Sequence, residues 1–116
     1  MSLGDLFGVH GTALTVRSQR LAVLASNIAN AGTPGYKARD IDFGRALSLA
    51  HNGHTAADAV NRATLYRVPT SSSIDGNTVE LSTEQTMFAE NALQYRTTLS
   101  FIEARANTIR RALKGE

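Results

Sequence analysis

Hydrophobic and polar positions at the C-terminal end of the chain follow one helical repeat. Apolar residues stand alternately four and three positions apart, at Phe88, Ala92, Tyr95, Leu99, Ile102, Ala106, Ile109 and Leu113. This 3.5-residue period keeps one apolar stripe facing a partner helix, as in a left-handed coiled coil. No Gly or Pro interrupts residues 83–114. The pattern predicts a helix of about 31 residues, roughly 46 Å long at 1.5 Å per residue.

Polar residues mark both ends of this predicted helix. Ser82 is followed three positions later by Gln85, the arrangement of a capping box. Cations occupy the last turns, where the helix dipole is negative, at Arg105, Arg110, Arg111 and Lys114. Gly115 follows them as a C-cap residue. Residues 82–116 are therefore predicted to form a C-terminal coiled-coil helix.

The N-terminal end carries a less regular version of the same pattern. Apolar residues recur every seven positions at Phe7, Leu14, Leu21 and Ile28, with Leu24 and Ala31 at companion positions. The other two companion positions hold His10 and Arg17, so the first half of this stripe is less apolar. Gly4, Gly8 and Gly11 each cost about 1 kcal/mol relative to Ala in a helix. We expect a regular helix from about Thr12, with residues 1–11 frayed or conditionally helical.

A helix stop and a tight turn follow. Gly32 stands where a left-handed C-cap residue is expected, and Thr33-Pro34-Gly35-Tyr36 comes next. Pro at the second and Gly at the third position of a four-residue turn are typical of type II, because Gly accepts the positive φ there. Residues 1–36 are thus predicted to be a helix ending in a type II turn.

Residues 37–81 lack a long-range period. Ile41, Phe43, Leu47 and Leu49 predict an extended stretch and then a short helix over 43–51. Residues 52–64 contain one large apolar side chain, Val60, and no element is predicted there. Residues 65–68 predict a short strand, and residues 74–79 a turn leading into a second extended piece. We expect this middle to be irregular and partly mobile.

Together these elements predict one structural unit of the mainly α class, in which the two terminal helices form a coiled-coil hairpin or bundle. The second helix exceeds the regular part of the first, which leaves roughly 16 Å of its stripe unpaired. Either residues 1–11 become helical and cover that length, or another chain does. A two-helix hairpin also buries one stripe of each helix, which is thin support for a monomer. We infer that the subunit completes its core by assembling, between helices and between subunits.

Composition narrows the class of protein further. The 116 residues are 42% hydrophobic but 6% aromatic, without Cys or Trp, so a large core is hard to build and disulfides and Cys-based zinc sites are excluded. The longest apolar run, residues 21–25, is far short of the roughly 20 residues that span a bilayer. Asp5 stands where a secretory signal carries basic residues, so we expect no cleaved signal peptide. A net charge of +2 is too weak by itself to indicate nucleic-acid binding.

Two patterns suggest catalytic or metal chemistry, and each has a plainer alternative. His51 and His54 have the spacing of metal ligands on one helix face, but Asn52-Gly53 interrupts that helix, and a solvated loop is the alternative. Asp40 and Asp42 would point to one side of an extended stretch, as a carboxylate pair or as an ordinary polar face. No nucleophile-elbow or Ser-His-Asp pattern is present. We therefore predict no enzyme activity, no cofactor and no metal site.

Two other patterns suggest anion binding. Residues 32–35 with Lys37 resemble a phosphate loop, but this loop follows a helix instead of opening one. Basic side chains at Arg17, Arg20, Arg105, Arg110 and Arg111 would suit a nucleic-acid-binding helical face. Interspersed carboxylates at Glu84, Glu90 and Glu103 favour solvated helix faces instead.

One longer string is more specific than any of these patterns. Residues 24–37 read Leu-Ala-Ser-Asn-Ile-Ala-Asn-Ala-Gly-Thr-Pro-Gly-Tyr-Lys. This string resembles the N-terminal signature of bacterial flagellar axial proteins, the family of rod, hook and hook-associated subunits. The flanking residues make the chain most similar to the family's proximal rod subunits. They are residues 38–43, 66–69 and 75–80, followed by Glu84, Phe88, Ala89, Asn91, Leu93 and Tyr95. The candidate signature residues are Asn27, Asn30, Gly32, Thr33, Pro34, Gly35 and Tyr36.

The local chemistry of this string is consistent with a helix-to-turn junction. Asn27 and Asn30 offer amide groups one turn apart, suited to bonding the backbone of the turn or of a neighbouring subunit. Tyr36 leaves the turn as an amphipathic anchor.

The resemblance implies a structural subunit of the basal-body rod, the drive shaft that crosses the periplasm between the membrane ring and the hook. It also implies export through the flagellar type III apparatus. The implied partners are copies of itself, other rod subunits, and membrane-ring or junction proteins, with no nucleic acid. A different rod or junction subunit is the alternative within the family, and a small helical nucleic-acid-binding protein is the alternative from another class.

We expect the two apolar stripes to form an assembly seam made of Leu14, Leu21, Leu24, Ile28, Phe88, Tyr95, Leu99, Ile102, Ile109 and Leu113. In the assembled rod, the first four would pack against Tyr95, Leu99, Ile102 and Ile109. Burial of the stripes contributes about 25 cal/mol per Å², offset by the entropy of ordering the chain ends.

Overall fold

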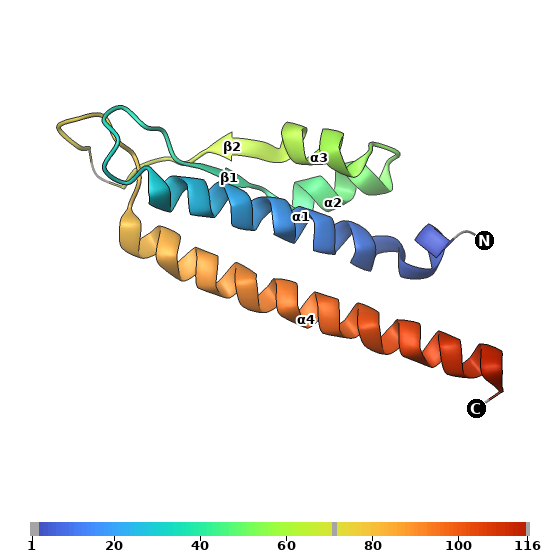
Figure 1. Cartoon of the computed structure of the whole chain (residues 1–116). Helices are drawn as coiled ribbons and strands as arrows, with labels where there is room; N and C mark the ends of the chain where they lie inside the picture. Colours follow the sequence, from blue (N-terminus) through green and yellow to red (C-terminus); the bar gives the residue numbers. More distant parts are fainter. Residues whose placement is uncertain (1–2, 71, 116) are drawn as a thin grey trace.

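The computed structural model describes residues 3–70 and 72–115, with side chains from residue 8 onward. The elements in chain order are α1 (Leu3–Ala29), β1 (Arg39–Ile41), α2 (Phe43–His51), α3 (Ala56–Ala63), β2 (Thr64–Tyr66) and α4 (Leu81–Lys114). Figure 1 shows α1 in the middle layer: α4 runs antiparallel along one side of it, and the short elements lie on the other. The predicted mainly helical fold, with packed terminal helices, is confirmed.

Helix α1 is longer than its regular repeat predicted. It begins at Leu3, and its backbone leaves helical geometry at Gly8, with φ 43° and ψ −123°. Gly adopts such angles without the steric cost that a Cβ imposes. Residues 3–11 are therefore helical around one kink, whereas residues 1 and 2 lie outside the described chain.

Helix α4 confirms the predicted element but not its predicted N-cap. The helix begins at Leu81 with Glu80 as N-cap and no side-chain cap hydrogen bond, so the capping box at Ser82 and Gln85 is wrong. The Glu80 carboxylate instead accepts hydrogen bonds from the backbone N–H and the hydroxyl of Thr70, at 2.9 and 2.8 Å. At the other end, Gly115 has φ 74° and is the predicted left-handed C-cap.

The predicted extended stretch and short helix around residue 43 are both present. β1 pairs antiparallel with β2, with Asp40 opposite Leu65. Asp42 is the N-cap of α2, and its carboxylate accepts a hydrogen bond from Arg45 N. The predicted turn at residues 74–79 contains Gly76 at φ 76°, but the extended piece after it is not part of a sheet.

Helix α3 was missed in the sequence because its buried face is built from small residues. Its buried side chains are Ala59, Val60 and Ala63, so large apolar residues at helical spacing are lacking. Its start is nevertheless encoded: the Thr55 hydroxyl accepts a hydrogen bond from Asp58 N at 3.1 Å. The middle is thus more regular than its composition predicted.

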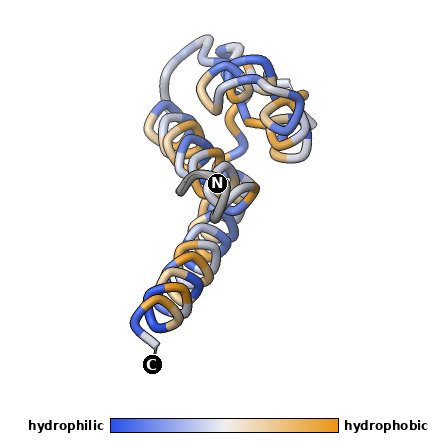
Figure 2. Tube along the Cα trace, turned by 90° about the vertical axis from the view of Figure 1, so that its right-hand side faces the viewer, coloured by the Kyte–Doolittle hydropathy of each residue, from blue (hydrophilic) through white to orange (hydrophobic). Residues whose placement is uncertain are grey.

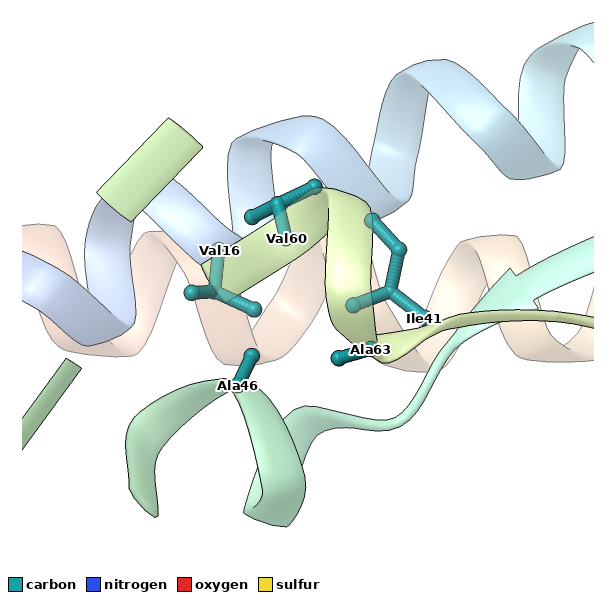
Figure 3. Close-up of a cluster of buried hydrophobic side chains, with 5 residues drawn as sticks. All are labelled: Val16, Ile41, Ala46, Val60 and Ala63. Carbon is teal, nitrogen blue, oxygen red and sulfur yellow. The ribbon is translucent and has the colours of Figure 1, made fainter. Parts of the chain in front are cut away.

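The main apolar cluster lies between α1 and the short elements. It consists of Val16, Ile41, Ala46, Val60 and Ala63, with Val23 and Phe43 packed against it. Figure 3 shows the five side chains converging from α1, β1, α2 and α3. The expectation that the core lies between the long helices is therefore wrong for this cluster. No described helix has the length and apolar content needed to cross a bilayer.

Candidate assembly interface

Asn27 connects the end of α1 to both β1 and α4. Its side chain is fully buried, and its Nδ2 donates to Arg39 O at 2.7 Å and to Glu84 Oε2 at 2.9 Å. Its Oδ1 accepts from Arg39 N at 3.1 Å and from the Tyr36 hydroxyl at 3.3 Å. A single amide therefore fixes the signature helix, the strand after it and the start of α4 relative to one another.

The C-terminus of α1 is capped from a distance. The Asn77 side-chain Nδ2 donates to the carbonyl oxygens of Asn30, Ala31 and Thr33, at 2.9, 3.1 and 2.8 Å. These carbonyls lie where a helix end leaves acceptors without partners. Gly32 does not have the positive φ of a left-handed cap, so its predicted role is wrong, and Asn77 performs the capping. Because Asn77 is 45 positions beyond Gly32, no local pattern indicates this.

The predicted type II turn is present. Tyr36 N donates to Thr33 O at 3.2 Å, and Gly35, after Pro34, has φ 76°. Gly35 N also donates to Asp75 O at 2.9 Å, which joins the turn to the segment before α4. The Asn30 side chain stays within the turn, donating to Ser26 O and accepting from the Thr33 hydroxyl.

An ion network around the fully buried Glu84 joins the middle to both long helices. The Arg67 guanidinium lies 2.8 Å from Glu84 Oε1 through Nε and 3.2 Å from Asp40 Oδ2 through Nη2. The Nε–H does not point at Oε1, so Coulomb attraction joins them more than a linear hydrogen bond. Arg20 binds Asp40 in a bidentate manner at 2.8 and 3.0 Å, and this hydrogen bonding raises the pKa of Arg20. Two cations thus balance two carboxylates, including the fully buried Glu84.

Three contacts show the register between α1 and α4. Asn27 binds Glu84, Arg17 Nη1 donates to Gln94 Oε1 at 2.8 Å, and the rings of His10 and Phe101 lie 4.5 Å apart. In each pair the residue numbers add to 111, so the register is constant along the described interface.

With this geometry established, comparison with known proteins shows the family. Residues 7–37 match the family model described as flagella basal body rod protein. The flagellar basal body rod protein FlgB of Cereibacter sphaeroides (strain ATCC 17029 / ATH 2.4.9) is 50% identical, over 97% of this chain and 96% of its own length. The chain belongs to the FlgB family of flagellar basal body rod proteins.

More distant relatives agree. FlgB of Aeromonas hydrophila is 42% identical over 100% of this chain and 98% of its own length. FlgB of Salmonella typhimurium is 42% identical over 89% of this chain and 88% of its own length. The predicted resemblance to proximal rod subunits is confirmed, and the chain is a structural protein of the basal body rod and not an enzyme.

The structure of this rod protein places the proposed seam residues in different environments. Leu24 is fully buried and Leu113 is 84% exposed. The remaining described members are half-buried: Leu14, Leu21, Ile28, Phe88, Tyr95, Leu99, Ile102 and Ile109. The side chain of Phe7 lies outside the described residues. The observed register sets Leu14 level with Thr97, so packing of Leu14, Leu21, Leu24 and Ile28 against Tyr95, Leu99, Ile102 and Ile109 stays a prediction for contacts between subunits.

The C-terminal third of α4 carries an apolar groove. The groove is lined by Phe101, Ala104, Arg105, Thr108 and Ile109. Figure 2 shows that apolar positions recur along α4 to its C-terminal end, which lies away from the short elements. This part of the helix keeps an apolar surface that the subunit itself does not fully cover.

The other candidate sites have structural roles. Asp40 belongs to the ion network and Asp42 caps α2, so they are not a carboxylate pair. His54 Nδ1 lies 2.6 Å from Asp58 Oδ2, an interaction that lowers the pKa of Asp58, and the described part of the chain contains no group of three metal-ligating side chains. Arg17 lies over the Phe43 ring at 4.0 Å, and Arg20 is paired, so neither belongs to an open basic face.

Proposed function

We propose that this rod protein is a proximal rod subunit that assembles through α1 and α4 into the drive shaft between membrane ring and hook. Its proposed partners are further copies, other rod subunits, and membrane-ring or junction proteins. We also propose that it reaches the periplasmic rod through the flagellar type III apparatus.

The observation that carries this proposal is the division of α4. Its first half contacts α1 through Glu84, Asn91 and Gln94, whereas the C-terminal third ends in an apolar groove and an exposed Leu113. An apolar surface flanked by polar residues is typical of a protein contact site. A rod subunit uses such a surface because contacts between different faces of successive copies continue along a filament instead of closing.

Burial on assembly supplies the favourable free energy. Each apolar side chain covered by a neighbour contributes at about 25 cal/mol per Å² of apolar surface. The helix end pays ordering entropy at the same step, so contact with one neighbour alone is weak and the completed rod is stable.

The test replaces Leu113 with Asp. Leu113 is 84% exposed in the subunit, so Leu113→Asp should leave the free energy of unfolding of the purified chain within about 0.5 kcal/mol of the parent. In cells, the variant should be exported but fail to enter the rod, which is measured by export assay, basal-body purification and motility.

The matched control is Leu93→Asp. Leu93 is also exposed, at 66%, but lies outside the apolar stripe of α4. We expect this variant to enter the rod and support motility. Normal rod incorporation of Leu113→Asp would refute the proposed role of the C-terminal third of α4.

A further inference from the structure

Apolar packing alone does not set the register of the two long helices. The stripe of α4 repeats every seven residues, at Phe88, Tyr95, Ile102 and Ile109, and α1 repeats likewise at Leu14, Leu21 and Ile28. Sliding α4 by seven residues therefore replaces each large apolar side chain by another of the same set. Burial of apolar area changes little on such a slide, so the observed register must be selected by other contacts.

Two fully buried polar residues interrupt this equivalence. Glu84 and Asn91 are seven residues apart and both contact α1. Glu84 Oε2 accepts from Asn27 Nδ2 at 2.9 Å, while Asn91 Nδ2 donates to the backbone oxygen of Arg17 at 2.9 Å. The next positions of the same repeat are Thr98 and Arg105, which have different chemistry.

We propose that Glu84 and Asn91 determine the register of α4 on α1 within the helix pair itself. They act beside the contacts of Asp75 and Asn77, which hold the segment before α4 at the end of α1. This proposal rests on the proposed function, because the same two helices assemble the rod. It adds to that function the residues that fix the alignment of α4 on α1. A buried polar side chain in a helix interface is known to select one register at a cost in stability.

The ion network makes a slide by one repeat unfavourable. A seven-residue slide that brings Asn91 opposite Asn27 removes the carboxylate of Glu84 from Arg67. The Arg67 guanidinium keeps Asp40, but Asp40 is already bound by Arg20. The Arg67 cation, whose side chain is 14% exposed, then lacks one of its two partners, which is costly in a poorly hydrated site.

The register of α4 on α1 in turn determines which length of α4 extends past α1 and can contact a neighbouring subunit. A slide of seven residues moves the helix by about 10 Å along its axis. The apolar groove at Phe101–Ile109 would then move by the same distance relative to α1. Glu84 and Asn91 therefore define the length of α4 that projects from the subunit.

The absence of Cys from the sequence permits a direct test by cross-linking the purified chain. The observed register is reported by Arg17→Cys with Gln94→Cys, because these side chains are in contact. Slipped registers are reported by Arg17→Cys with Phe101→Cys or with Met87→Cys, seven residues on either side. The hydrogen bond from the Asn91 side chain goes to the backbone oxygen of residue 17, so Arg17→Cys does not remove it. A short thiol-reactive cross-linker joins whichever pair is close.

Each reporter is placed in four backgrounds: the parent, Asn91→Leu, the triple variant Arg67→Met/Glu84→Leu/Asn91→Leu, and the control Gln85→Leu/Glu90→Leu. The triple variant removes the cation with the carboxylate, so no buried charge is left alone. The control adds leucines at exposed neighbouring positions of the same helix.

In the parent and the control, the 17–94 cross-link should exceed both slipped cross-links by about a hundredfold. In the triple variant, at least one slipped cross-link should rise at least about tenfold above its parent level, and Asn91→Leu should give a smaller rise. Circular dichroism first checks that the triple variant keeps the helix content of the parent. If it does, and the yields of both slipped cross-links stay at the parent level, the proposal is overturned. If the triple variant is unfolded, the same result in Asn91→Leu overturns it. Because the reporter uses free subunits, its failure leaves the rod-incorporation test of Leu113→Asp unaffected.

Discussion

The two ends of α4 use the same helical repeat in different ways. The first half is fixed by buried polar contacts: Glu84 to Asn27 and Arg67, and Asn91 to the backbone of Arg17. The C-terminal third carries an apolar groove, an exposed Leu113 and four cations. This difference teaches that polar contacts define the geometry of the subunit, whereas the apolar surface at its C-terminal end stays available for the proposed contacts with neighbours.

The largest expected effect comes from removing the cation of the ion network. Arg67→Ala leaves Glu84 buried without its main cationic partner, and we expect a loss of about 3–5 kcal/mol in the free energy of unfolding. Arg105→Ala, at the exposed end of the same helix, should change it by less than about 0.5 kcal/mol. Urea denaturation of both variants measures the contrast, and equal losses would show that the two ends of α4 are not different.

The signature turn gives a smaller and sharper contrast between two glycines. Gly35 has φ 76°, so Gly35→Ala should cost about 1–2 kcal/mol, because a Cβ is disfavoured in the left-handed region. Gly32 lacks positive φ, and no neighbouring atom lies within 4 Å of the position that a Cβ would take. Gly32→Ala should therefore be neutral or stabilising by up to about 1 kcal/mol. Thermal unfolding of both variants checks this. A larger loss from Gly32→Ala would contradict the assignment of the cap to Asn77.

The smallest expected effect is the loss of stability in acid of the segment before α4, which contains Asp75 and Glu80. The backbone N–H of Asn77 and the Ser73 hydroxyl lower the pKa of Asp75, and the backbone N–H and hydroxyl of Thr70 lower the pKa of Glu80. A carboxyl whose folded pKa lies below its unfolded value stabilises the fold above the unfolded pKa. This contribution is lost as the pH falls through the folded pKa.

Carbon-detected NMR titration of the carboxyl groups measures this effect. The titration midpoints of Asp75 and Glu80 should lie below the ordinary values of 3.8 and 4.5. Replacing Thr70 by Pro, which removes the backbone donor, should move the midpoint of Glu80 upward and leave that of Asp75 unchanged. Ordinary midpoints in the parent would show that these hydrogen bonds do not persist in solution.

Periodicity predicted the parts of this fold that depend on neighbours in sequence. The 3.5-residue repeat gave α4 nearly to the residue, and Pro34-Gly35 gave the turn, because both depend on local backbone preferences. Helix α3 was missed because alanines form its buried face. Its N-cap pair, Thr55 and Asp58, was the signal that marked it.

The contacts that shape the candidate interface are separated too far in sequence for such patterns. Asn77 caps α1 across more than forty residues, and Arg67 brings the charge that permits Glu84 to be buried. In the sequence, Glu84 stands among other acidic residues and is indistinguishable from a solvated one. Pairing of two distant charges decides its burial, and no local spacing encodes that pairing.

Hydrogen exchange along α4, in the free subunit and in purified rods, tests the central claim most directly. Amides of residues 84–99 should be protected in the free subunit, because buried polar contacts hold that half of the helix on α1. Amides of residues 105–114 should exchange faster in the free subunit and become protected in the rod. Equal protection of both segments in the free subunit, with no gain on assembly, would contradict the account.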